Sequence, residues 1–345
     1  MRVFSIPMST RFRGVTRREG VLVRGPAGWG EFSPFAEYGP EEAARWLAAA
    51  REAAFVGWPA PVRDRVPVNV TVPAVGPERA FAMVRASGCR TAKVKVAERG
   101  QGDADDMARV EAVRDALGPQ GRVRVDVNGG WDVEHAVRMV RALDRFDLEY
   151  VEQPCGSLEE LAAVRLRVDV PVAADESIRR AEDPLRVKAA GAADVAVLKV
   201  QPLGGVRAAL RVAEATGLPV VVSSAVETSV GLAAGVALAA ALPELPFACG
   251  LGTLSLLTGD VVDDPLVPVG GEIAVRRPAV DEVALAAAEA GAEAAASWRA
   301  RLAAAEKVLA AAGDGASGYL GSLPSAGAAG RTGRAGDAAG EGVVR

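Results

Sequence analysis

The sequence predicts an α/β protein: a (β/α)8-type barrel with a small α+β capping domain and a disordered C-terminal tail. From residue 66 onward, short β-branched runs alternate with helical runs of about ten to fifteen residues. Eight such strands are present, and eight parallel strands with crossover helices close into a barrel. An open doubly wound sheet is the alternative, but it usually has a Gly-rich first turn, and no GxGxxG or GKS motif follows the first predicted strand, 66–72.

The first 65 residues are expected to form the N-terminal part of the cap. Apolar and polar residues alternate there in three short runs, at 2–7, 20–24 and 29–32, which predicts a small antiparallel meander. A helix is expected over 41–56, because Pro40 suits the first helical position.

Two segments of the cap, 9–18 and 33–39, are expected to lie over the barrel mouth as mobile loops. The first is rich in arginine, which would either attract a dicarboxylate substrate or form a solvated surface. The arginines concerned are Arg11, Arg13, Arg17 and Arg18.

The barrel is expected over residues 66–256. Its strands are predicted at 66–72, 91–96, 123–128, 148–152, 170–175, 193–200, 218–223 and 247–252, with helices between them at 103–117, 133–143, 158–168, 204–216 and 231–242. Segment 257–312 is expected to pack back on barrel and cap, with one or two helices in 280–312, where Ala, Glu, Leu and Arg dominate. Residues 313–345 are rich in Gly and Ala with few large apolar residues, which predicts disorder.

Composition excludes several classes of function. A net charge of −4 provides no positive field for nucleic acid or an anionic membrane, and the apolar stretch 231–242 is too short to span a bilayer. Three distant cysteines indicate neither disulfides nor a thiolate metal site, so we expect a cytoplasmic protein. The single histidine, His135, is expected on the outer layer of the barrel. An enzyme built on this chain must therefore use Lys, Asp, Glu, the backbone or a metal.

Charged residues end successive predicted strands. Lys93 and Lys95 share one face of the second strand, and the following strands end in Asp126, Glu152, Asp175 and Lys199. These last four residues follow one another at intervals of 26, 23 and 24 residues, so each βα unit delivers one charge to the mouth. Singly, each is more often a solvated rim residue. The combination of these residues is harder to explain in that way, because unpaired charges inside apolar strands would cost free energy. The three carboxylates would form an all-oxygen site suited to Mg2+.

The ordered set of motifs resembles the muconate-lactonizing subgroup of the enolase superfamily. The motifs are Lys-x-Lys at 93–95, Asp-Val-Asn at 126–128, Val-Glu-Gln-Pro at 151–154, Ala-Asp-Glu-Ser at 174–177, Leu-Lys at 198–199 and Ser-Ser-Ala-Val-Glu-Thr-Ser at 223–229. The resemblance covers residues 1–312 and implies an enzyme that forms an enediolate next to a divalent metal.

The resemblance also implies roles for individual residues. Mg2+, with Mn2+ as an alternative metal, would be held by Asp126, Glu152 and Asp175, and Lys95 would be the general base. Lys199, on the opposite face, would stabilise the intermediate as a cation. Lys93 would be a second cation that favours the neutral amine of Lys95, or would simply pack against or pair with a carboxylate. Asn128 and Glu176 would orient the ligands, or form ordinary structural hydrogen bonds.

Substrate contacts are expected after the last two strands. Ser223, Ser224 and Ser229 would bind a carboxylate, with helix capping as the alternative for Ser229, and the small residues around Gly252 would leave room for substrate. No acid ends the eighth strand, although Asp260 lies slightly beyond. Dipeptide epimerases of the subgroup bind an ammonium group with acids at that position.

The short cap and the serine-rich stretch are most similar to a menaquinone-pathway enzyme of the subgroup. The resemblance therefore implies Mg2+-dependent syn elimination of water from 2-succinyl-6-hydroxy-2,4-cyclohexadiene-1-carboxylate, giving o-succinylbenzoate. The alternatives are racemisation of an N-acylamino acid, another activity of the lactonizing subgroup, and a catalytically silent binding protein. In each case a small-molecule carboxylate is the expected partner, with no nucleic acid and no membrane, and the oligomeric state stays open.

Overall fold

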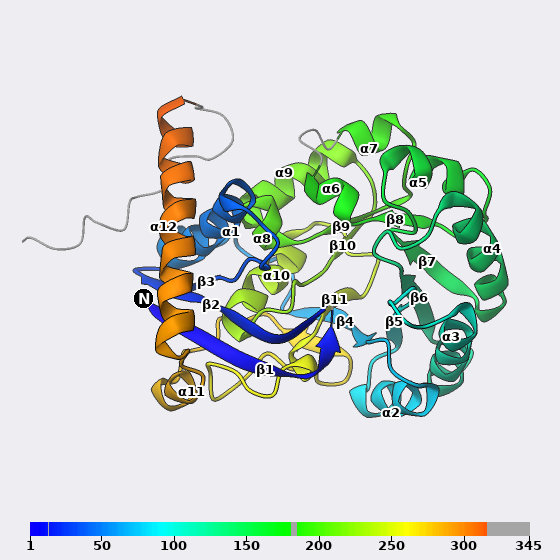
Figure 1. The fold of residues 1–345 in the computed structure, drawn as a ribbon, viewed down its shortest axis with the longest axis horizontal. Helices are drawn as coiled ribbons and strands as arrows, with labels where there is room; N and C mark the ends of the chain where they lie inside the picture. Colours follow the sequence, from blue (N-terminus) through cyan, green and yellow to red (C-terminus); the bar gives the residue numbers. More distant parts are fainter. Residues whose placement is uncertain (13, 181–184, 316–345) are drawn as a thin grey trace, which may run out of the picture.

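The structure, a computed structural model, describes residues 1–12, 14–180 and 185–315. The predicted barrel is confirmed (Figure 1). Its parallel strands are β4 (Arg65–Val72), β5 (Thr91–Lys95), β6 (Arg122–Asp126), β7 (Leu148–Glu152), β8 (Val172–Ala174), β9 (Val195–Leu198), β10 (Val220–Val222) and β11 (Cys249–Gly252). The sheet order is β10-β9-β8-β7-β6-β5-β4-β11, and a parallel bridge between Ser223 and Gly250 joins the two end strands. The sheet thereby curls back on itself.

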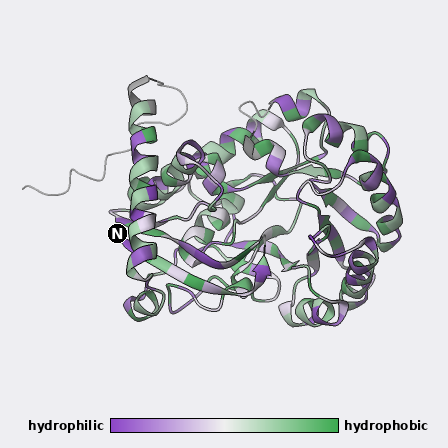
Figure 2. Ribbon diagram, viewed as in Figure 1, coloured by the Kyte–Doolittle hydropathy of each residue, from purple (hydrophilic) through white to green (hydrophobic). Residues whose placement is uncertain are grey.

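Helices cover the outside of the sheet. They are α2 (Pro77–Ser87), α3 (Asp103–Leu117), α4 (Val133–Leu143), η2 (Asp144–Phe146), α5 (Leu158–Arg165), α6 (Glu176–Arg180), α7 (Leu185–Ala189), α8 (Val200–Leu203), α9 (Val206–Thr216) and α10 (Ser229–Ala241). Figure 2 shows hydrophobic and hydrophilic residues alternating along the outer helices, as expected where one face packs on a core. Almost all residues of α10 are buried, because the cap covers it. Within the described part of the chain, no helix has the length and apolarity needed to cross a membrane.

The cap is a three-stranded antiparallel sheet with one main helix. Its elements are β1 (Arg2–Phe12), β2 (Val15–Gly25), β3 (Gly28–Phe32), α1 (Pro40–Arg51) and the π-helical turn η1 (Glu52–Val56). The expected meander and helix are therefore confirmed. The expected mobile loop at 9–18 is wrong for its described residues, because β1 and β2 continue through it and pair as far as Phe12 and Val15. The polar residues Ser9, Thr10 and Arg11 hide the strand pattern there, although Met8 and Phe12 on either side of them pack against the core.

The chain after β11 returns to the cap, as expected for segment 257–312. It contains η3 (Leu254–Leu256), β12 (Glu272–Ala274), which pairs antiparallel with β4, and the helices α11 (Glu282–Ala287) and α12 (Ala292–Gly315). On α12, the Trp298 ring packs edge-on against Phe32 of the cap, with 6.1 Å between centroids. Helix α12 includes 313–315, which the sequence assigned to the tail; the rest of that predicted tail, 316–345, lies outside the described residues. The domain boundaries themselves stay a prediction.

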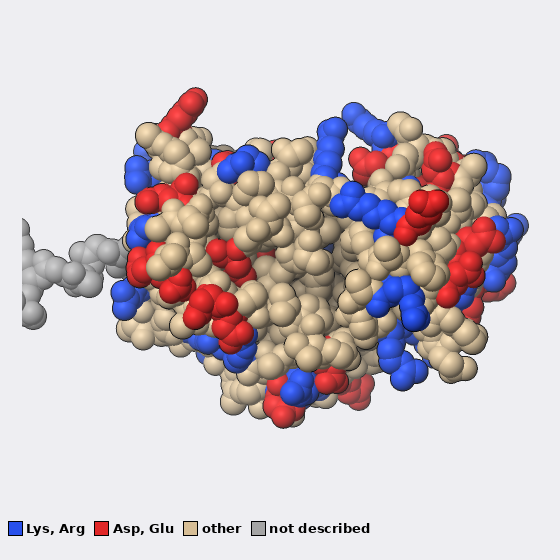
Figure 3. Space-filling view, turned by 90° about the horizontal axis from the view of Figure 1, so that it is seen from below, with Lys and Arg blue, Asp and Glu red and all other residues tan. Residues whose placement is uncertain are grey.

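The cysteines are buried, whereas the histidine lies on the outside of the barrel. Cys89, Cys155 and Cys249 are free. His135 lies in the first turn of α4 on the outer layer, with Nε2 2.8 Å from Asp103 Oδ1. On the face seen in Figure 3, basic and acidic side chains are interspersed around a largely uncharged centre.

Two buried glutamates join the cap to the barrel. Glu31 at the end of β3 accepts hydrogen bonds from the N–H groups of Thr228 and Gly231 at the start of α10, both at 3.1 Å, and from the Thr228 hydroxyl at 2.5 Å. Glu52 in η1 accepts likewise from Val206 N–H at the start of α9. A carboxylate at a helix N-terminus satisfies backbone donors that the helix leaves unpaired. The cap is therefore attached at the start of two barrel helices.

Burial has a large effect on Glu31. It raises the pKa of Glu31 to about 7; hydrogen bonds from Thr228 and Ser33 act in the opposite direction, and the neighbouring Glu227 raises the pKa further. The folded protein therefore keeps the Glu31 proton to higher pH than the unfolded chain, in which a glutamate titrates near 4.5. Wild-type stability should fall as pH rises between these two values.

Glu31→Gln removes this titration while keeping an oxygen that can accept from Thr228 and Gly231. We expect the variant to gain stability relative to wild type between pH 4.5 and 7, by up to about 3 kcal/mol, with no further gain above pH 7. Urea unfolding at pH 5, 6, 7 and 8 measures this, with exposed Glu41→Gln as the control. A stability difference between Glu31→Gln and wild type that does not change with pH would contradict the titration.

Candidate active site

The register of neighbouring strands brings the predicted charges together. Lys95 on β5 is paired in register with Asp126 on β6, and Asp126 with Glu152 on β7. Parallel strands end at the same edge of a barrel, so these side chains meet at its mouth. All three are buried, although they are ionisable.

Lys93 is the ammonium shared between two carboxylates. Its Nζ lies 2.7 Å from Glu152 Oε1 and 3.0 Å from Asp126 Oδ2. Burial disfavours the charged amine, but Asp126 and Glu152 outweigh burial and hold the pKa of Lys93 well above its usual value. Burial acts against the Asp126 carboxylate too, yet Lys93 and Lys95 hold its pKa well below the usual range. The sequence alternative that Lys93 pairs with a carboxylate is thus what the structure contains.

Lys95 lies beside Lys93 on the cavity side. Its Nζ donates to Asp126 Oδ2 at 2.6 Å and to the side-chain oxygen of Asn128. Asn128 has a positive φ of 51° and donates through Nδ2 to Glu176 Oε1 at 3.2 Å. Asparagine is one of the few residues other than glycine that tolerate this left-handed conformation. Asn128 and Glu176 therefore form the chain of hydrogen bonds through which Lys95 is held.

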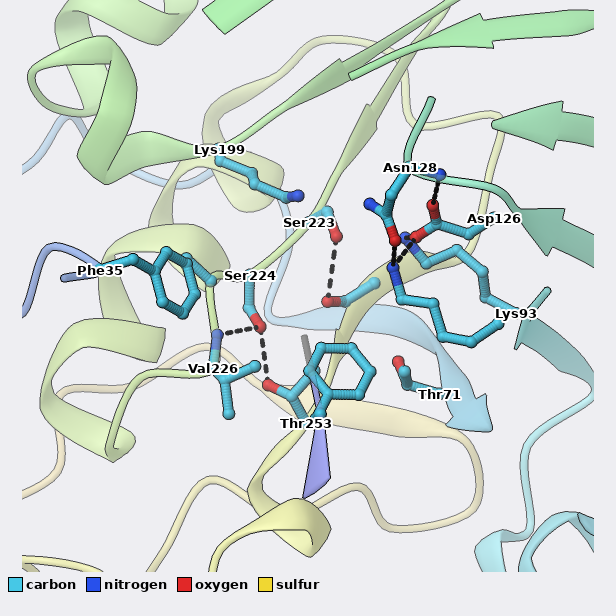
Figure 4. A pocket seen from close by; sticks show the side chains of 14 residues that line it. Phe35, Thr71, Lys93, Asp126, Asn128, Lys199, Ser223, Ser224, Val226 and Thr253 are labelled. Carbon is cyan, nitrogen blue, oxygen red and sulfur yellow. Dashed lines mark hydrogen bonds and ion pairs between the residues drawn. The ribbon is translucent and has the colours of Figure 1, made fainter. Parts of the chain in front are cut away.

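Lys199 approaches from the other side of the cavity. Its Nζ lies 2.5 Å from Asp175 Oδ2. Figure 4 shows Lys199 reaching toward the cavity opposite Lys93 and Asp126. The two-sided arrangement expected from β5 and β9 is therefore present.

The carboxylates Asp126, Glu152 and Asp175 do not form a ready-made metal site here. Among the described residues, no group of three His, Cys, Asp or Glu side chains is close enough to hold an ion. Lysine ammonium groups instead contact one oxygen of each carboxylate.

The residues present nevertheless fit a hard divalent cation. The donors are carboxylate oxygens, which Mg2+ prefers. Glu152 Oε2 is buried and has no hydrogen-bond partner in the described chain. Such an orphaned carboxylate oxygen is costly unless a ligand satisfies it. Burial and the nearby Asp126 also raise the pKa of Glu152 to about 7.

Gln153 is a site residue that sequence reasoning did not single out. Its side-chain oxygen accepts from the N–H groups of Asp175 at 3.0 Å and Ser177 at 3.2 Å, and its Nε2 donates to Ser177 Oγ at 2.8 Å. Gln153 thus ties the end of β7 to the end of β8 and fixes Asp175 relative to Glu152. A glutamine directly after the glutamate that ends an apolar strand is the sequence signal that could have indicated it.

The serine-rich segment after β10 divides between the cavity and the scaffold. Ser223 and Ser224 line the cavity, and Ser224 Oγ lies 2.7 Å from Thr253 Oγ1 (Figure 4). Ser229 lies in the first turn of α10 and does not line the cavity. Its hydroxyl donates to Asp260 Oδ2 at 2.5 Å. Asp260, the acid beyond the eighth strand, therefore forms a structural hydrogen bond outside the cavity lining.

Gly252 also lies outside the cavity lining. A Cβ at that position would come within 2.6 Å of the Asn69 carbonyl on β4. The glycine is therefore explained by close strand packing, and the expected substrate role gains no support from its position. Gly250, two residues earlier, does line the cavity.

Two aromatic residues of the cap complete the wall. Phe12 at the tip of the β1–β2 hairpin has its ring centroid 5.2 Å from Lys95 Nζ, and Phe35, in the segment expected to form a loop over the mouth, lines the cavity from another side. Sequence reasoning placed the cap over the mouth but identified neither ring. Both follow only from the three-dimensional docking of cap on barrel.

Comparisons with known proteins agree with this architecture. A family model described as enolase C-terminal domain-like matches residues 77–279, and one described as enolase N-terminal domain-like matches 3–54. A protein of Thermobifida fusca named o-succinylbenzoate synthase is 75% identical over 304 residues, covering 88% of this chain and 95% of that protein. The protein of that name from Mycolicibacterium smegmatis is 57% identical over 300 residues, covering 86% and 92%.

Solved structures share the fold at lower identity. Muconate lactonizing enzyme of Pseudomonas fluorescens complexed with muconolactone superposes with a TM-score of 0.73 at 23% identity, covering 84% of this chain and 97% of that one. The L-Ala-D/L-Glu epimerase of Bacillus subtilis gives 0.69 at 24% identity, covering 80% and 95%. The chain therefore belongs to the enolase superfamily, and within it groups with the proteins named o-succinylbenzoate synthase.

Proposed function

We propose that this protein is a hydro-lyase that converts 2-succinyl-6-hydroxy-2,4-cyclohexadiene-1-carboxylate to o-succinylbenzoate in menaquinone biosynthesis. The observation that carries this proposal is the 75% identity to a protein named for that product, over 95% of its length. A cavity with amines on opposite sides fits the chemistry. Free, buried thiols suit a reducing compartment, and we place the reaction in the cytoplasm.

A divalent metal is part of the proposal, as in the superfamily to which the chain belongs. Asp126, Glu152 and Asp175 would hold Mg2+, or Mn2+ in its place. When bound, the ion supplies positive charge that neutralises the substrate carboxylate and the negative charge developing on it.

The chain's own amines perform the proton chemistry. Lys95 Nζ, as a neutral amine, takes the proton from the carbon next to the substrate carboxylate. The same Nζ then gives that proton to the departing hydroxyl, which leaves as water, so both transfers occur on one face of the ring. Lys93 lies beside Lys95 as an ammonium group that is held by Asp126 and Glu152.

Lys199 faces the reacting carbon from the other side. Its ammonium stabilises the electron-rich intermediate without exchanging a proton. Phe12, close to Lys95, excludes water from that side of the cavity, which strengthens these electrostatic interactions.

Racemisation of an N-acylamino acid is the second candidate. Amines on opposite sides of a cavity are what a two-base proton transfer requires. Lys95 and Lys199 both line this cavity, Lys95 from β5 and Lys199 from the position directly after β9. An acid that binds a substrate ammonium group is a feature of the dipeptide epimerases, and here Asp260 is hydrogen-bonded to Ser229 instead. We therefore favour an uncharged or anionic substrate arm over a dipeptide.

Metal binding is testable without turnover. Mg2+ at 100 times its dissociation constant should raise the free energy of unfolding of wild type by about 2.7 kcal/mol. Glu152→Gln should lose most of this gain, because it removes a ligand charge, whereas Asp115→Asn, an exposed change on α3, should keep it. Thermal unfolding with and without Mg2+ measures the difference. An equal gain in Glu152→Gln and wild type would refute the assigned ligand.

The two lysines should respond differently to substitution. Lys95→Ala should lower kcat for dehydration by about 10²- to 10⁴-fold, the usual contribution of a general base. Lys199→Arg keeps a cation but not a base, so it should retain dehydration while abolishing any racemisation.

Assays of both reactions on the same preparations separate these roles. Full dehydration activity in Lys95→Ala would overturn the mechanism. Dehydration lost in Lys199→Arg while that variant still binds Mg2+ would contradict a purely electrostatic role for Lys199.

A further inference from the structure

Arg18 is a cation buried inside the cap–barrel junction. It lies on β2 and is only 3% exposed, in contrast to the solvated or substrate-attracting arginine that the sequence predicted. Its Nε donates to the Val226 carbonyl at 2.8 Å, and its Nη2 donates to the Ser33 carbonyl at 2.7 Å and hydroxyl at 3.2 Å. The guanidinium also lies 4.4 Å from the centroid of the Phe35 ring. The planar guanidinium group thus contacts the cap and the barrel at the same time.

Two of these contacts are to walls of the substrate cavity. Val226 and Phe35 both line it, and Figure 4 shows them on the side away from Lys93 and Asp126. Arg18 itself does not line the cavity. It can therefore influence substrate only through the residues that it holds.

Val226 requires such support. Its φ is +61°, in the left-handed region, which a β-branched side chain adopts at a cost of about 1–3 kcal/mol. Its carbonyl is held by Arg18 from the cap, and its N–H donates to Ser224 Oγ at 3.1 Å. Without the guanidinium, the carbonyl would be free to turn and the strain could relax, which would move this wall of the cavity.

We propose that Arg18 is a positioning residue that determines substrate fit, by locking Val226 and Phe35 into one rigid wall opposite the reacting groups. This inference rests on the proposed function, in that the cavity is taken as the substrate site. A wall that contacts the non-reacting part of a substrate affects both binding and alignment, and displacements near 1 Å can cost about 100-fold in rate.

The charge of Arg18 has a separate effect. Glu31 and Glu227 are buried, and the positive charge of Arg18 favours the ionised form of both. A test must therefore separate the loss of the positive charge from the loss of the planar guanidinium group and its several contacts. Arg18→Lys keeps the charge and the aliphatic stem but cannot reach Val226, Ser33 and Phe35 together.

The experiment compares steady-state dehydration by wild type, Arg18→Lys and the control Arg24→Lys, an exposed arginine on the same strand. We expect Arg18→Lys to raise KM by about tenfold or more and to lower kcat, with the Mg2+-dependent thermal shift unchanged. The control should match wild type. A role in stability alone would reduce the active fraction, and hence the apparent kcat, but would leave KM unchanged.

The outcomes are distinct. A KM for Arg18→Lys within about twofold of wild type would overturn the positioning role, whereas wild type without dehydration activity would overturn the proposed function and this inference with it. If Arg18→Lys does not fold, Val226→Gly serves instead, because it loosens the same carbonyl while leaving the guanidinium in place. An unchanged KM in Val226→Gly would equally refute the proposal.

Discussion

The pairing of Lys93 with Asp126 and Glu152 is the constraint on which the mouth of the barrel depends. Three carboxylates and three ammonium groups alternate there in a buried space, each carboxylate within 3.0 Å of a lysine. Removing one partner of such a set costs about 3–5 kcal/mol, because the remaining charge is left uncompensated. The set therefore persists only as a whole, and strand register maintains it by placing Lys95, Asp126 and Glu152 side by side.

The cap follows a related rule at its junction with the barrel. Its buried charges are satisfied chiefly by backbone groups of the barrel, with Glu31 at the start of α10, Glu52 at the start of α9 and Arg18 on the Val226 carbonyl. Charge-assisted hydrogen bonds of this kind are strong and directional. Both helix starts and the carbonyl lie in the segments that follow β9 and β10, so docking of the cap and the shape of the cavity are fixed by the same contacts.

Much of this could be predicted from the sequence because the signals are local. Strand ends recur every 23 to 26 residues with one charge each, and this spacing alone brings Asp126, Glu152 and Asp175 to one edge. Lys199 follows at the same spacing, whereas Lys93 and Lys95 lie 33 and 31 residues before Asp126 and are marked instead by their two-residue spacing on one strand face. Gln153 was not predicted as a site residue, because its role depends on a hydrogen bond to the next strand. The spacing of charged residues along the chain carries no information about such a bond.

The cap residues could not be predicted for a different reason. Arg18 and Val226 are 208 positions apart, and Glu31 and Thr228 are 197 apart, so nothing near Arg18 in sequence distinguishes it from its exposed neighbour Arg17. The tip of the hairpin was not predicted as strand because polar residues at 9–11 interrupt the apolar alternation that marks buried strands, although Met8 and Phe12 contact the core.

Lysine pairing does not use every carboxylate oxygen at the mouth. Asp126 Oδ2 already accepts from both Lys93 and Lys95, whereas Glu152 Oε2 has no partner among the described residues. A metal ion and a lysine ammonium group that approach Asp126 would compete for the same lone pairs of its carboxylate. The lysines thus act as internal counter-ions that hold the pKa of Asp126 well below its usual range despite burial, and Lys95 lines the same cavity as Phe12. The same lysine–carboxylate contacts accordingly balance the buried charges at the mouth and place the Lys95 amine at the cavity.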